Sequence, residues 1–519
     1  MHESLLKARH LWQFVDLAIQ RRGDHPLWIQ RLAKGERRVT SYAAIGRRAA
    51  AIAARLREAG VGAGDRVAIL SANGPDWSAA AFAVWRLGGV VAPLHTGNSD
   101  HELQMQHDAL APKCTLYAGD ERGLPRALEI GSDEREADTD EPADPDPHAE
   151  AARMYTSGTT GNARIVRLSH DNILSNIRGA ARLDIPISHR DRFLSLLPLS
   201  HAMEMTGGML LPVYHGAAIV VPRMIAAGEI LEAMKQERIT LMIAVPRLYR
   251  NIMLGMEKKF AAAGPLLCAY VALVRRAPEW LARVINAPIR RQLGGGIHCW
   301  LSGGSRLDPD IARYFRALGI PLIQGYGLTE CGPVVSVQSP HDPRLDSVGP
   351  PLYGMQVKIH EPNAAGDGEL WVRGPNLMLG YVDDAQTAEA MEDGWYKTGD
   401  IGCLVDGSKI VLTGRSKRLI VTEAGKNVYP EDIEIMLEKH PALKEAGVIE
   451  VDMAPAAVLA VEGPDEQAKA ADIVSDYNRR ASSHNRIARW AVVNELPRTP
   501  LGKVSLKDLP QVFEDNEVT

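Results

Sequence analysis

The sequence lacks any long apolar run. The stretch 204–222 is rich in apolar residues, yet it contains His215, two prolines and three glycines. A membrane-spanning helix needs about 20 consecutive apolar residues. We therefore expect no transmembrane segment and, at most, peripheral contact with a membrane.

Cysteines are also few and scattered. The chain has five, an odd number whose wide spacing favours neither a disulfide framework nor a zinc site: Cys114, Cys268, Cys299, Cys331 and Cys403. The first 22 residues lack the basic region, apolar region and cleavage site of an export signal. Both observations predict a cytoplasmic protein.

Neither sign of charge dominates. Lys and Arg number 59 against 64 Asp and Glu, a formal net charge of −5. Without a general basic field, nucleic acid is not expected as the main partner. A chain of 519 residues exceeds what one hydrophobic core usually supports, which predicts about two to four domains or subdomains.

Apolar strands alternate with helical segments through the first two thirds of the chain. Arg66–Leu70 and Val90–Leu94 are largely apolar and flank a predicted helix at Trp77–Leu87. Asp308 followed by Pro309 predicts the start of another helix. Buried strands joined by helices are typical of doubly wound parallel sheets, so we predict an α/β fold.

The last third of the chain has a different character. Short alternating strands at Gln356–His360, Glu369–Val372 and Lys409–Leu412 predict a small β subdomain over about residues 333–414. Helix and strand signals beyond it indicate a compact α+β domain. The predicted division is an N-terminal domain of residues 1–414 and a small, mobile C-terminal domain of residues 415–519.

Two segments have an unusual composition. Ser132–Glu150 is acidic and contains three prolines, which predicts a solvated, partly disordered loop. Lys258–Arg291 alternates apolar residues with basic ones and could rest on an anionic membrane surface. A packed helical pair with a solvated basic face is the preferred interpretation of this second segment.

The stretch 154–170 contains the first candidate binding loop. It combines hydroxyl groups that donate to phosphate oxygens with glycines that allow tight turns: Thr156, Ser157, Gly158, Thr159, Thr160 and Gly161. A P-loop would end in Gly-Lys-Ser/Thr, whereas Gly161 is followed by Asn162, Ala163 and Arg164. Taken alone, the loop is interpreted equally well as a phosphate cradle or as a surface turn.

A second candidate is Gly325-Tyr326-Gly327-Leu328-Thr329-Glu330. It follows a predicted strand, which places it at the carboxyl edge of the sheet, where such folds bind ligands. Tyr326 is suited to stacking on a base, Thr329 to donating to a phosphate, and Glu330 to holding a hard cation. By itself this is a weak pattern.

Three later patterns add charged candidates. Asp400 is expected in a turn, where its carboxylate could accept hydrogen bonds from ribose hydroxyls, although Asp after Gly is usually only a turn residue. Gly414-Arg415-Ser416-Lys417 lies where the β region ends, a position suited to a hinge. Lys503 is presented by a glycine-bearing turn, and most exposed lysines have no chemical role.

The order of these patterns is distinctive. From the N-terminus they are Tyr-Thr-Ser-Gly-Thr-Thr-Gly, Ser-Gly-Gly, Gly-Tyr-Gly-Leu-Thr-Glu, Tyr-Lys-Thr-Gly-Asp, Gly-Arg-Ser-Lys and Pro-Arg-Thr-Pro-Leu-Gly-Lys. Over nearly its whole length the chain resembles the adenylate-forming superfamily, which includes acyl-CoA synthetases, luciferases and peptide-synthetase adenylation domains. Each motif alone is only moderately specific, whereas the ordered set is very specific.

The resemblance implies roles for the residues at matching positions. Those implied to bind ATP are Thr156, Ser157, Gly158, Thr159, Thr160, Gly161, Arg164, Ser302, Gly303, Gly304, Gly325, Tyr326, Gly327, Asp400 and Arg415. Lys503, Thr329 and Glu330 are implied as catalytic, with Glu330 and Thr159 as metal ligands. Lys417 matches the hinge, Gly425 the pantetheine path, and His201 and Met203 the acyl pocket.

The family performs a two-step reaction, which the resemblance implies here too. A carboxylate attacks the α-phosphorus of ATP and gives an acyl adenylate and pyrophosphate, while Mg²⁺ and Lys503 neutralise charge. A thiol then displaces AMP, after a rotation of the C-terminal domain that removes Lys503 and brings Gly425. The implied cofactors are therefore ATP, Mg²⁺ and CoA.

Two departures from the family pattern leave alternatives open. Ala163-Arg164-Ile165 stands where Pro-Lys-Gly is usual, and Arg changes the geometry of phosphate contact. Val448–Val461 lacks a common Gly-Glu pair, so a carrier protein acting in trans is an alternative acceptor to CoA. A non-catalytic nucleotide- or acyl-binding relative is the rival hypothesis, although Lys503, Glu330 and Asp400 are retained.

The substrate hypothesis depends on the region around His201. Leu-Pro-Leu-Ser-His at 197–201, followed by Met203, Met205 and Met209, resembles the fatty-acid branch of the superfamily. Methionine-rich surfaces adapt to flexible apolar chains, although these residues are also ordinary core residues. A medium- or long-chain fatty acid is the first choice, and an aryl or polycyclic acid is the alternative.

Overall fold

The computed structural model describes residues 3–131, 140–156, 164–262, 279–422, 426–461, 466–498 and 504–518. The chain divides into two compact units. The first unit comprises Met1–Thr156, Ile165–Gln356 and Arg373–Glu389, and the second comprises Ser157–Arg164, Val357–Val372 and Ala390–Thr519. The predicted domain boundary between residues 414 and 415 stays a prediction.

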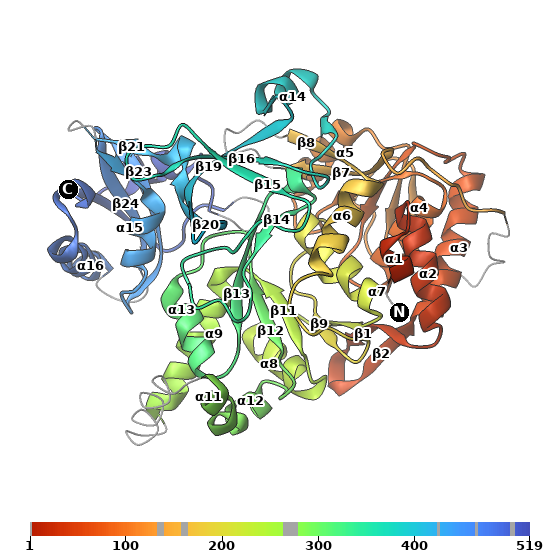
Figure 1. Ribbon diagram of the computed structural model, residues 1–519, viewed down its shortest axis with the longest axis horizontal. Coiled ribbons are helices and arrows are strands. Elements are labelled where there is room, and N and C mark those ends of the chain that lie inside the picture. Colours follow the sequence, from red (N-terminus) through yellow and green to blue (C-terminus); the bar gives the residue numbers. More distant parts are fainter. Residues whose placement is uncertain are drawn as a thin grey trace. The chain divides into compact units, whose positions relative to one another are not determined.

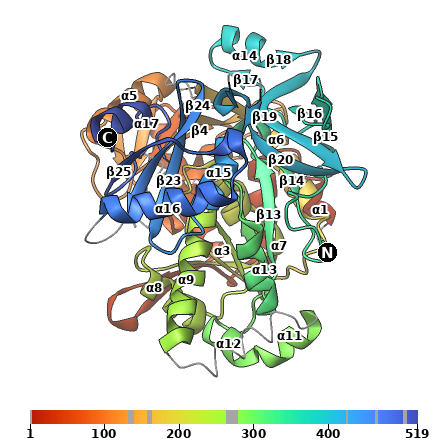
Figure 2. The same ribbon diagram turned by 90° about the vertical axis from the view of Figure 1, so that its left-hand side faces the viewer.

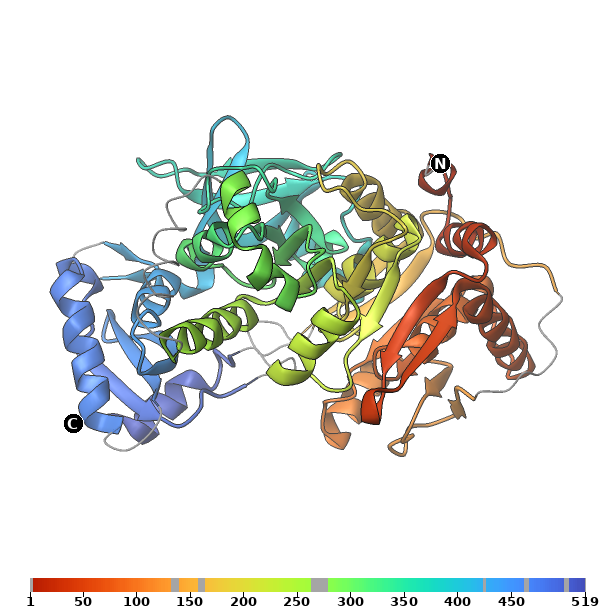
Figure 3. The same cartoon turned by 90° about the horizontal axis from the view of Figure 1, so that it is seen from below.

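The first unit contains a sheet that, within the described residues, has eight strands in the order β14-β13-β12-β11-β9-β10-β1-β2. Its inner pairs are parallel, and β2 and β14 form antiparallel edges. Figure 1 shows β11, β12 and β13 side by side, and the red β1–β2 pair lies at one edge (Figure 3). The strands are β1 (Pro26–Arg31), β2 (Arg37–Ser41), β9 (Arg192–Leu194), β10 (Ala218–Val221), β11 (Leu241–Ala244), β12 (Cys299–Ser302), β13 (Leu322–Gly327) and β14 (Val334–Val337).

A second sheet in the same unit has seven described strands in the order β17-β8-β7-β4-β3-β5-β6. The pairs around β3 and β4 are parallel, and every residue of β4 is buried. The strands are β3 (Arg66–Leu70), β4 (Val90–Leu94), β5 (Cys114–Tyr117), β6 (Ala127–Glu129), β7 (Glu150–Thr156), β8 (Arg164–Ser169) and β17 (Gly380–Tyr381). The predicted α/β fold with parallel sheets is confirmed.

Helices connect these strands and cover the sheets. Ser41 caps α3 by accepting a hydrogen bond from the Ala44 N–H, and Asp308 caps α13 as predicted. Trp300 of β12 and Phe315 of α13 are buried with ring centroids 5.1 Å apart. The helices are α1 (Glu3–Leu6), α2 (Leu11–Arg22), α3 (Tyr42–Glu58), α4 (Pro75–Arg86), α5 (Asp100–Leu110), α6 (His170–Ala180), η2 (Glu204–Leu210), α7 (Leu211–His215), α8 (Ala227–Gln236), α9 (Pro246–Ala262), α11 (Glu279–Ile285), α12 (Ala287–Gln292), α13 (Pro309–Ala317), η3 (Thr329–Cys331) and α14 (Asp384–Ala390), with a short 3₁₀ turn η1 (Ala33–Gly35).

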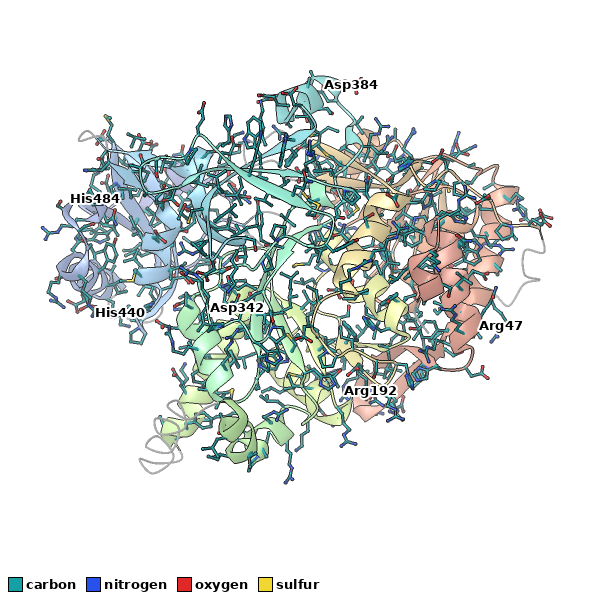
Figure 4. The ribbon with its side chains drawn as sticks, viewed as in Figure 1. Arg47, Arg192, Asp342, Asp384, His440 and His484 are labelled. Carbon is teal, nitrogen blue, oxygen red and sulfur yellow. The ribbon has the colours of Figure 1, made fainter. Side chains whose placement is uncertain are left out.

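A buried ionic cluster supports the start of β9. The Glu237 side chain is 4% exposed and lies 3.3 Å from the guanidinium of Arg192, which is labelled in Figure 4. Arg31 and Arg37 approach the same carboxylate at 3.5 Å. Three cations around one buried carboxylate satisfy a charge that would otherwise be costly to bury.

The second unit contains a β sheet and a separate α+β part. The β sheet runs β15-β16-β19-β18, with β20 paired to β19. In the α+β part, α15 and α16 pack on one face of the sheet β23-β24-β25 and α17 on the other (Figure 2). The elements are β15 (Gln356–His360), β16 (Gly368–Arg373), β18 (Met391–Glu392), β19 (Trp395–Val405), β20 (Lys409–Arg415), η4 (Ser416–Arg418), β21 (Ile420–Val421), β22 (Asn427–Val428), α15 (Pro430–Leu437), β23 (Leu443–Val451), β24 (Ala454–Val461), α16 (Glu466–Arg480), η5 (Ser483–Asn485), β25 (Arg489–Val493) and α17 (Leu509–Asn516).

The structure corrects two local predictions. Gly325–Gly327 belongs to β13 instead of following it, because these residues pair antiparallel with β14. Asp400 lies within β19 and not in a turn. In the acidic segment, residues 132–139 lie outside the described residues, and the side chains of Asp140 and Asp144 are 67% and 68% exposed, in agreement with the predicted solvated loop.

The basic segment is described only in part. Its helices α9, α11 and α12 are described, and residues 263–278 lie outside the described residues. Across the part of the chain that the structure describes, no helix is both long and apolar enough to cross a bilayer.

Candidate nucleotide and acyl site

The carboxyl edge of the first sheet brings several predicted residues together. Ser302 ends β12, and its Oγ is buried without a hydrogen-bond partner among the described residues, so it is available to a ligand. A β-carbon on Gly303 would lie 2.7 Å from Met203 Sδ and 3.8 Å from the Gly325 carbonyl oxygen. A larger residue at position 303 would have to displace the Met203 side chain, which places a predicted acyl-pocket residue against the predicted adenine-binding segments.

Close packing also explains the glycines beside Tyr326. A side chain on Gly327 would overlap the main chain of Pro333, and Gly304 has a φ of +85°. Tyr326 lies between Gly325 and Gly327, is 8% exposed and pairs with Ser336 of β14. The main chain at this edge is therefore fixed by strand pairing before any ligand binds.

Glu330 lies just beyond β13, in the short helical turn η3. Its Oε1 accepts a hydrogen bond from the Tyr381 hydroxyl at 2.8 Å, and its carbonyl accepts one from the Met378 N–H at 2.8 Å. Asn176 of α6 braces the following residues, donating to the Cys331 carbonyl at 3.0 Å and accepting from the Val334 N–H at 2.8 Å. Thr329 starts the same turn, so the two predicted catalytic residues of this motif are held together.

His201 lies just before the π-helix η2, and a buried acid, Glu204, is the first residue of that helix. The His201 ring centroid is 5.9 Å from that of His95, at the end of β4. Glu204 is 1% exposed and accepts a 2.6 Å hydrogen bond from Ser195 Oγ. Burial raises the pKa of Glu204 to about 8, and the hydrogen bonds from Ser195 and the Leu197 main chain only partly offset that burial.

Sequence reasoning missed Glu204 and the network around it. Asn73 donates to Ser195 Oγ at 2.8 Å and to the Leu197 carbonyl at 2.6 Å, and it accepts from the Leu199 N–H at 2.9 Å. The network thereby fixes the loop that leads to His201. A single acidic residue inside the apolar run 202–214 was the signal that could have found it.

The predicted ribose-binding residues lie in the second unit. Asp400 of β19 and Arg415 of β20 are paired across the two strands, with Arg415 Nε 3.0 Å from Asp400 Oδ1. The Asp400 side chain is 7% exposed and that of Arg415 is 44% exposed, so the pair presents its cationic side to solvent. Lys417, the predicted hinge residue, lies in η4 directly after this strand.

The predicted phosphate loop is described only at its ends. Thr156 ends β7 and Arg164 begins β8, and these two strands are neighbours in the second sheet. Ser157, Gly158, Thr159, Thr160 and Gly161 lie outside the described residues, as do Gly425 and Lys503.

A divalent cation would find few protein ligands here, which suits Mg²⁺. Among the described residues no group of three or more His, Cys, Asp or Glu side chains could hold a metal alone. Mg²⁺ on a nucleotide usually takes one or two protein ligands and phosphate oxygens for the rest. Glu330 fits this role, because its Oε2 accepts no hydrogen bond from the described residues.

Comparison with known proteins identifies the family of this chain. The AMP-binding enzyme family matches residues 15–382. The chain belongs to this family. Among curated proteins it is 29% identical to a long-chain-fatty-acid–CoA ligase, FadD15, of Mycobacterium bovis, over 82% of this chain and 78% of that protein. It is 30% identical to a 2-succinylbenzoate–CoA ligase of Bacillus velezensis, over 74% of each chain.

Solved structures show the same architecture. An O-succinylbenzoate coenzyme A synthetase of Bacillus subtilis, in complex with AMP, superposes with a TM-score of 0.79 at 25% identity, covering 96% of this chain and 98% of that one. The same enzyme with ATP and a magnesium ion gives a TM-score of 0.77 at 24% identity. Large α/β sheets followed by a smaller C-terminal domain are thus the architecture of adenylate-forming enzymes.

The family fixes the reaction class but not the acid. The chain is an adenylate-forming acyl-CoA ligase, and such ligases use ATP, Mg²⁺ and CoA, as expected from the sequence. Its relatives include long-chain fatty-acid, feruloyl and 2-succinylbenzoate ligases at 29–30% identity. Identity at this level does not separate these substrates.

Proposed function

We propose that this chain activates a medium- or long-chain fatty acid with ATP and transfers the acyl group to CoA. The observation that carries the choice of acid is the apolar packing at the carboxyl edge of the first sheet. A β-carbon on Gly303 would lie 2.7 Å from Met203 Sδ, and one on Gly207 would lie 2.9 Å from the side chain of Ile243. Thioether and alkyl groups suit a flexible hydrocarbon chain and offer no partner to a second carboxylate.

The proposed reaction begins with attack of the fatty-acid carboxylate on the α-phosphorus of ATP, which releases pyrophosphate. Glu330 and Thr329 would lie at the phosphates, and Asp400 and Arg415 would hold the ribose. Glu330 and Thr159 would hold Mg²⁺, which would neutralise charge on the phosphate oxygens. The fixed main chain of Gly325–Gly327 positions the nucleotide in advance, so little reorganisation is needed during the step.

The second step transfers the acyl group to a thiol. The CoA thiolate attacks the carbonyl carbon of the acyl adenylate, and AMP leaves with the bonding electrons. The roles of Lys503 in the first step, Gly425 in the second and Lys417 as the pivot between them are proposed from their matching positions in the sequence.

Pyrophosphate release with acids of graded chain length tests this function. The purified chain should release pyrophosphate with ATP, Mg²⁺ and acids of about 8 to 18 carbons, and CoA should be consumed in equal amount. Parallel reactions with a holo carrier protein decide the acceptor. If none of the fatty acids supports release from a folded protein, the proposal fails.

An aryl acid is the second candidate, favoured by the 29% identity to a feruloyl-CoA synthase of an Amycolatopsis species over 79% of this chain. The same assay with ferulate, coumarate and 2-succinylbenzoate separates the two. A kcat/KM higher for any of these than for every fatty acid would select this candidate.

A further inference from the structure

The Tyr381 phenol is fixed at both ends. Its side chain is completely buried, and its hydroxyl donates to Glu330 Oε1 at 2.8 Å. Its own N–H donates to Thr387 Oγ1 at 2.8 Å, within α14, whose first residue Asp384 is labelled in Figure 4. A buried ring with both polar groups engaged has little freedom to move, so it fixes the direction of the carboxylate that it contacts.

Tyr381 also belongs to a strand that is joined to the exit of the phosphate loop. In β17, Tyr381 pairs with Val166 of β8. The Val382 N–H donates to the Ile165 carbonyl at 2.9 Å, and the Leu379 N–H donates to that of Arg167 at 2.9 Å. Because β8 follows residues 157–163 directly, a continuous hydrogen-bonded path leads from that strand through Tyr381 to the Glu330 carboxylate.

The turn that carries Glu330 has other supports. The Met378 N–H and both polar atoms of the Asn176 amide hold its main chain from either side. Loss of the Tyr381 hydroxyl would therefore leave the turn in place and release only the side chain of Glu330. Because the main chain of the turn and the side chain of Glu330 have different supports, the role of the hydroxyl can be tested without disturbing the fold.

We propose that Tyr381 is a positioning residue that orients the Glu330 carboxylate toward the cation on the nucleotide phosphates. Through the pairing of β17 with β8, Tyr381 also holds this carboxylate at a fixed position relative to the strand that follows the predicted phosphate loop. The proposal rests on the proposed function, in which Glu330 meets the Mg²⁺–nucleotide complex. Tyr381 uses Oε1, and Oε2 remains the oxygen for the cation. Without the hydroxyl, the carboxylate must be ordered when the nucleotide binds, which weakens that contact.

Tyr381→Phe removes the hydroxyl and keeps the ring. Tyr42→Phe is the matched control, because Tyr42 is also fully buried and its hydroxyl donates at 2.8 Å, but to the Ala217 carbonyl and not to a candidate site residue. Calorimetric titration of ATP, in Mg²⁺ and in EDTA, measures binding without any acid substrate. We expect Tyr381→Phe to bind ATP about tenfold more weakly in Mg²⁺, equivalent to about 1.4 kcal/mol, with no change in EDTA, and Tyr42→Phe to match the parent in both.

A second pair of variants tests whether the effect passes through Glu330. In a Glu330→Gln background, Tyr381→Phe should cause no further loss of ATP affinity in Mg²⁺. In pyrophosphate release, raising the Mg²⁺ concentration should restore the rate of Tyr381→Phe. Unchanged affinity in Mg²⁺, or an equal loss in EDTA, would show that the hydroxyl is only structural.

The binding readout separates this inference from the proposed function. If no acid supports pyrophosphate release but Tyr381→Phe selectively weakens binding in Mg²⁺, the inference stands and the proposed reaction falls. If the acids turn over and Tyr381→Phe behaves as the parent, the reaction stands and the inference falls. If the parent itself binds ATP equally in Mg²⁺ and EDTA, the inference falls because Glu330 meets no cation.

Discussion

Replacing Glu204 with glutamine should make the protein more stable at alkaline pH than the parent. Burial raises the pKa of Glu204 from 4.5 to about 8 in the folded state, and the two groups that offset this, Ser195 and the Leu197 main chain, are uncharged. Below pH 4.5 the acid is neutral in both states. Between pH 4.5 and 8 the unfolded chain is ionised and the folded chain is not, so folding takes up a proton.

The size of this effect follows from the interval between the two pKa values. The free energy of unfolding falls by about 1.4 kcal/mol for each pH unit in that range. From 4.5 to about 8 the loss from this one residue is roughly 5 kcal/mol, an order-of-magnitude figure. Stability from the neutral acid is thus fully present below pH 4.5 and lost as pH rises through 8.

Glutamine reproduces the neutral acid at every pH. Its Oε1 can still accept the 2.6 Å hydrogen bond from Ser195 Oγ. Its amide takes the place of Oε2, which is buried and has no hydrogen-bond partner in the described structure. Near pH 5 the variant should therefore match the parent to within about 1 kcal/mol, and the difference should widen in its favour with each pH unit.

Urea unfolding followed by tryptophan fluorescence at pH 5, 7 and 8.5 measures the difference, provided that the slope of the transition stays constant. Glu237→Gln is the control, since Glu237 is also buried but is surrounded by Arg31, Arg37 and Arg192. That variant should lose about 1–3 kcal/mol, because the buried guanidinium of Arg31 loses a charged partner while Arg37 and Arg192 remain 57% and 34% exposed. Parallel pH profiles for Glu204→Gln and the parent would refute the reasoning.

Other site residues give separate predictions. Lys503→Ala should abolish pyrophosphate release but spare thioester formation from a supplied acyl adenylate, and loss of both half-reactions would contradict its assigned role. Asp400→Asn should raise the KM for ATP at least about tenfold, since a hydrogen bond to a charged group contributes about 1.5–3 kcal/mol, while leaving the KM for the acid unchanged. Gly303→Ala places a methyl group 2.7 Å from Met203 Sδ, so it should shift the preferred fatty acid to a shorter chain, as read from kcat/KM across the series.

The strands and helices that could be predicted are those with strong local signals. Arg66–Leu70 and Val90–Leu94 were predicted with their observed bounds because buried parallel strands are nearly continuous apolar runs. Asp308 and Pro309 marked the start of α13 in the same way. In the last third, Gln356–His360 was also predicted with its observed bounds.

The errors arise where partners distant in sequence decide the structure. Gly325–Gly327 is poor strand sequence, and it is a strand only because β14 pairs with it. Asp400 follows a glycine and was expected in a turn, yet its pairing with Arg415 extends β19 through it. No local signal marks these pairings, because they depend on the fold as a whole.

The motif residues of the candidate site could be predicted from sequence, but the residues that hydrogen-bond to them could not. Thr329 and Glu330 were found from sequence, whereas Tyr381 and Asn176, which hold Glu330 and its turn, were not. Hydrogen-bond partners from elements far along the chain have no spacing that a motif could reveal. Sequence therefore gives the candidate ligand-binding residues more readily than the residues that hold them in place.

The π-helix η2 makes the length of its segment as important as its composition. A π-turn contains one residue more than an α-turn, so the main chain widens to hold a residue for which an α-helix has no room. Deleting one residue within Glu204–Leu210 should therefore let the segment close into ordinary α-helical turns. The widened main chain and one side chain of the segment would be lost together. A deletion here should therefore change the main chain of the segment, which a single substitution would leave in place.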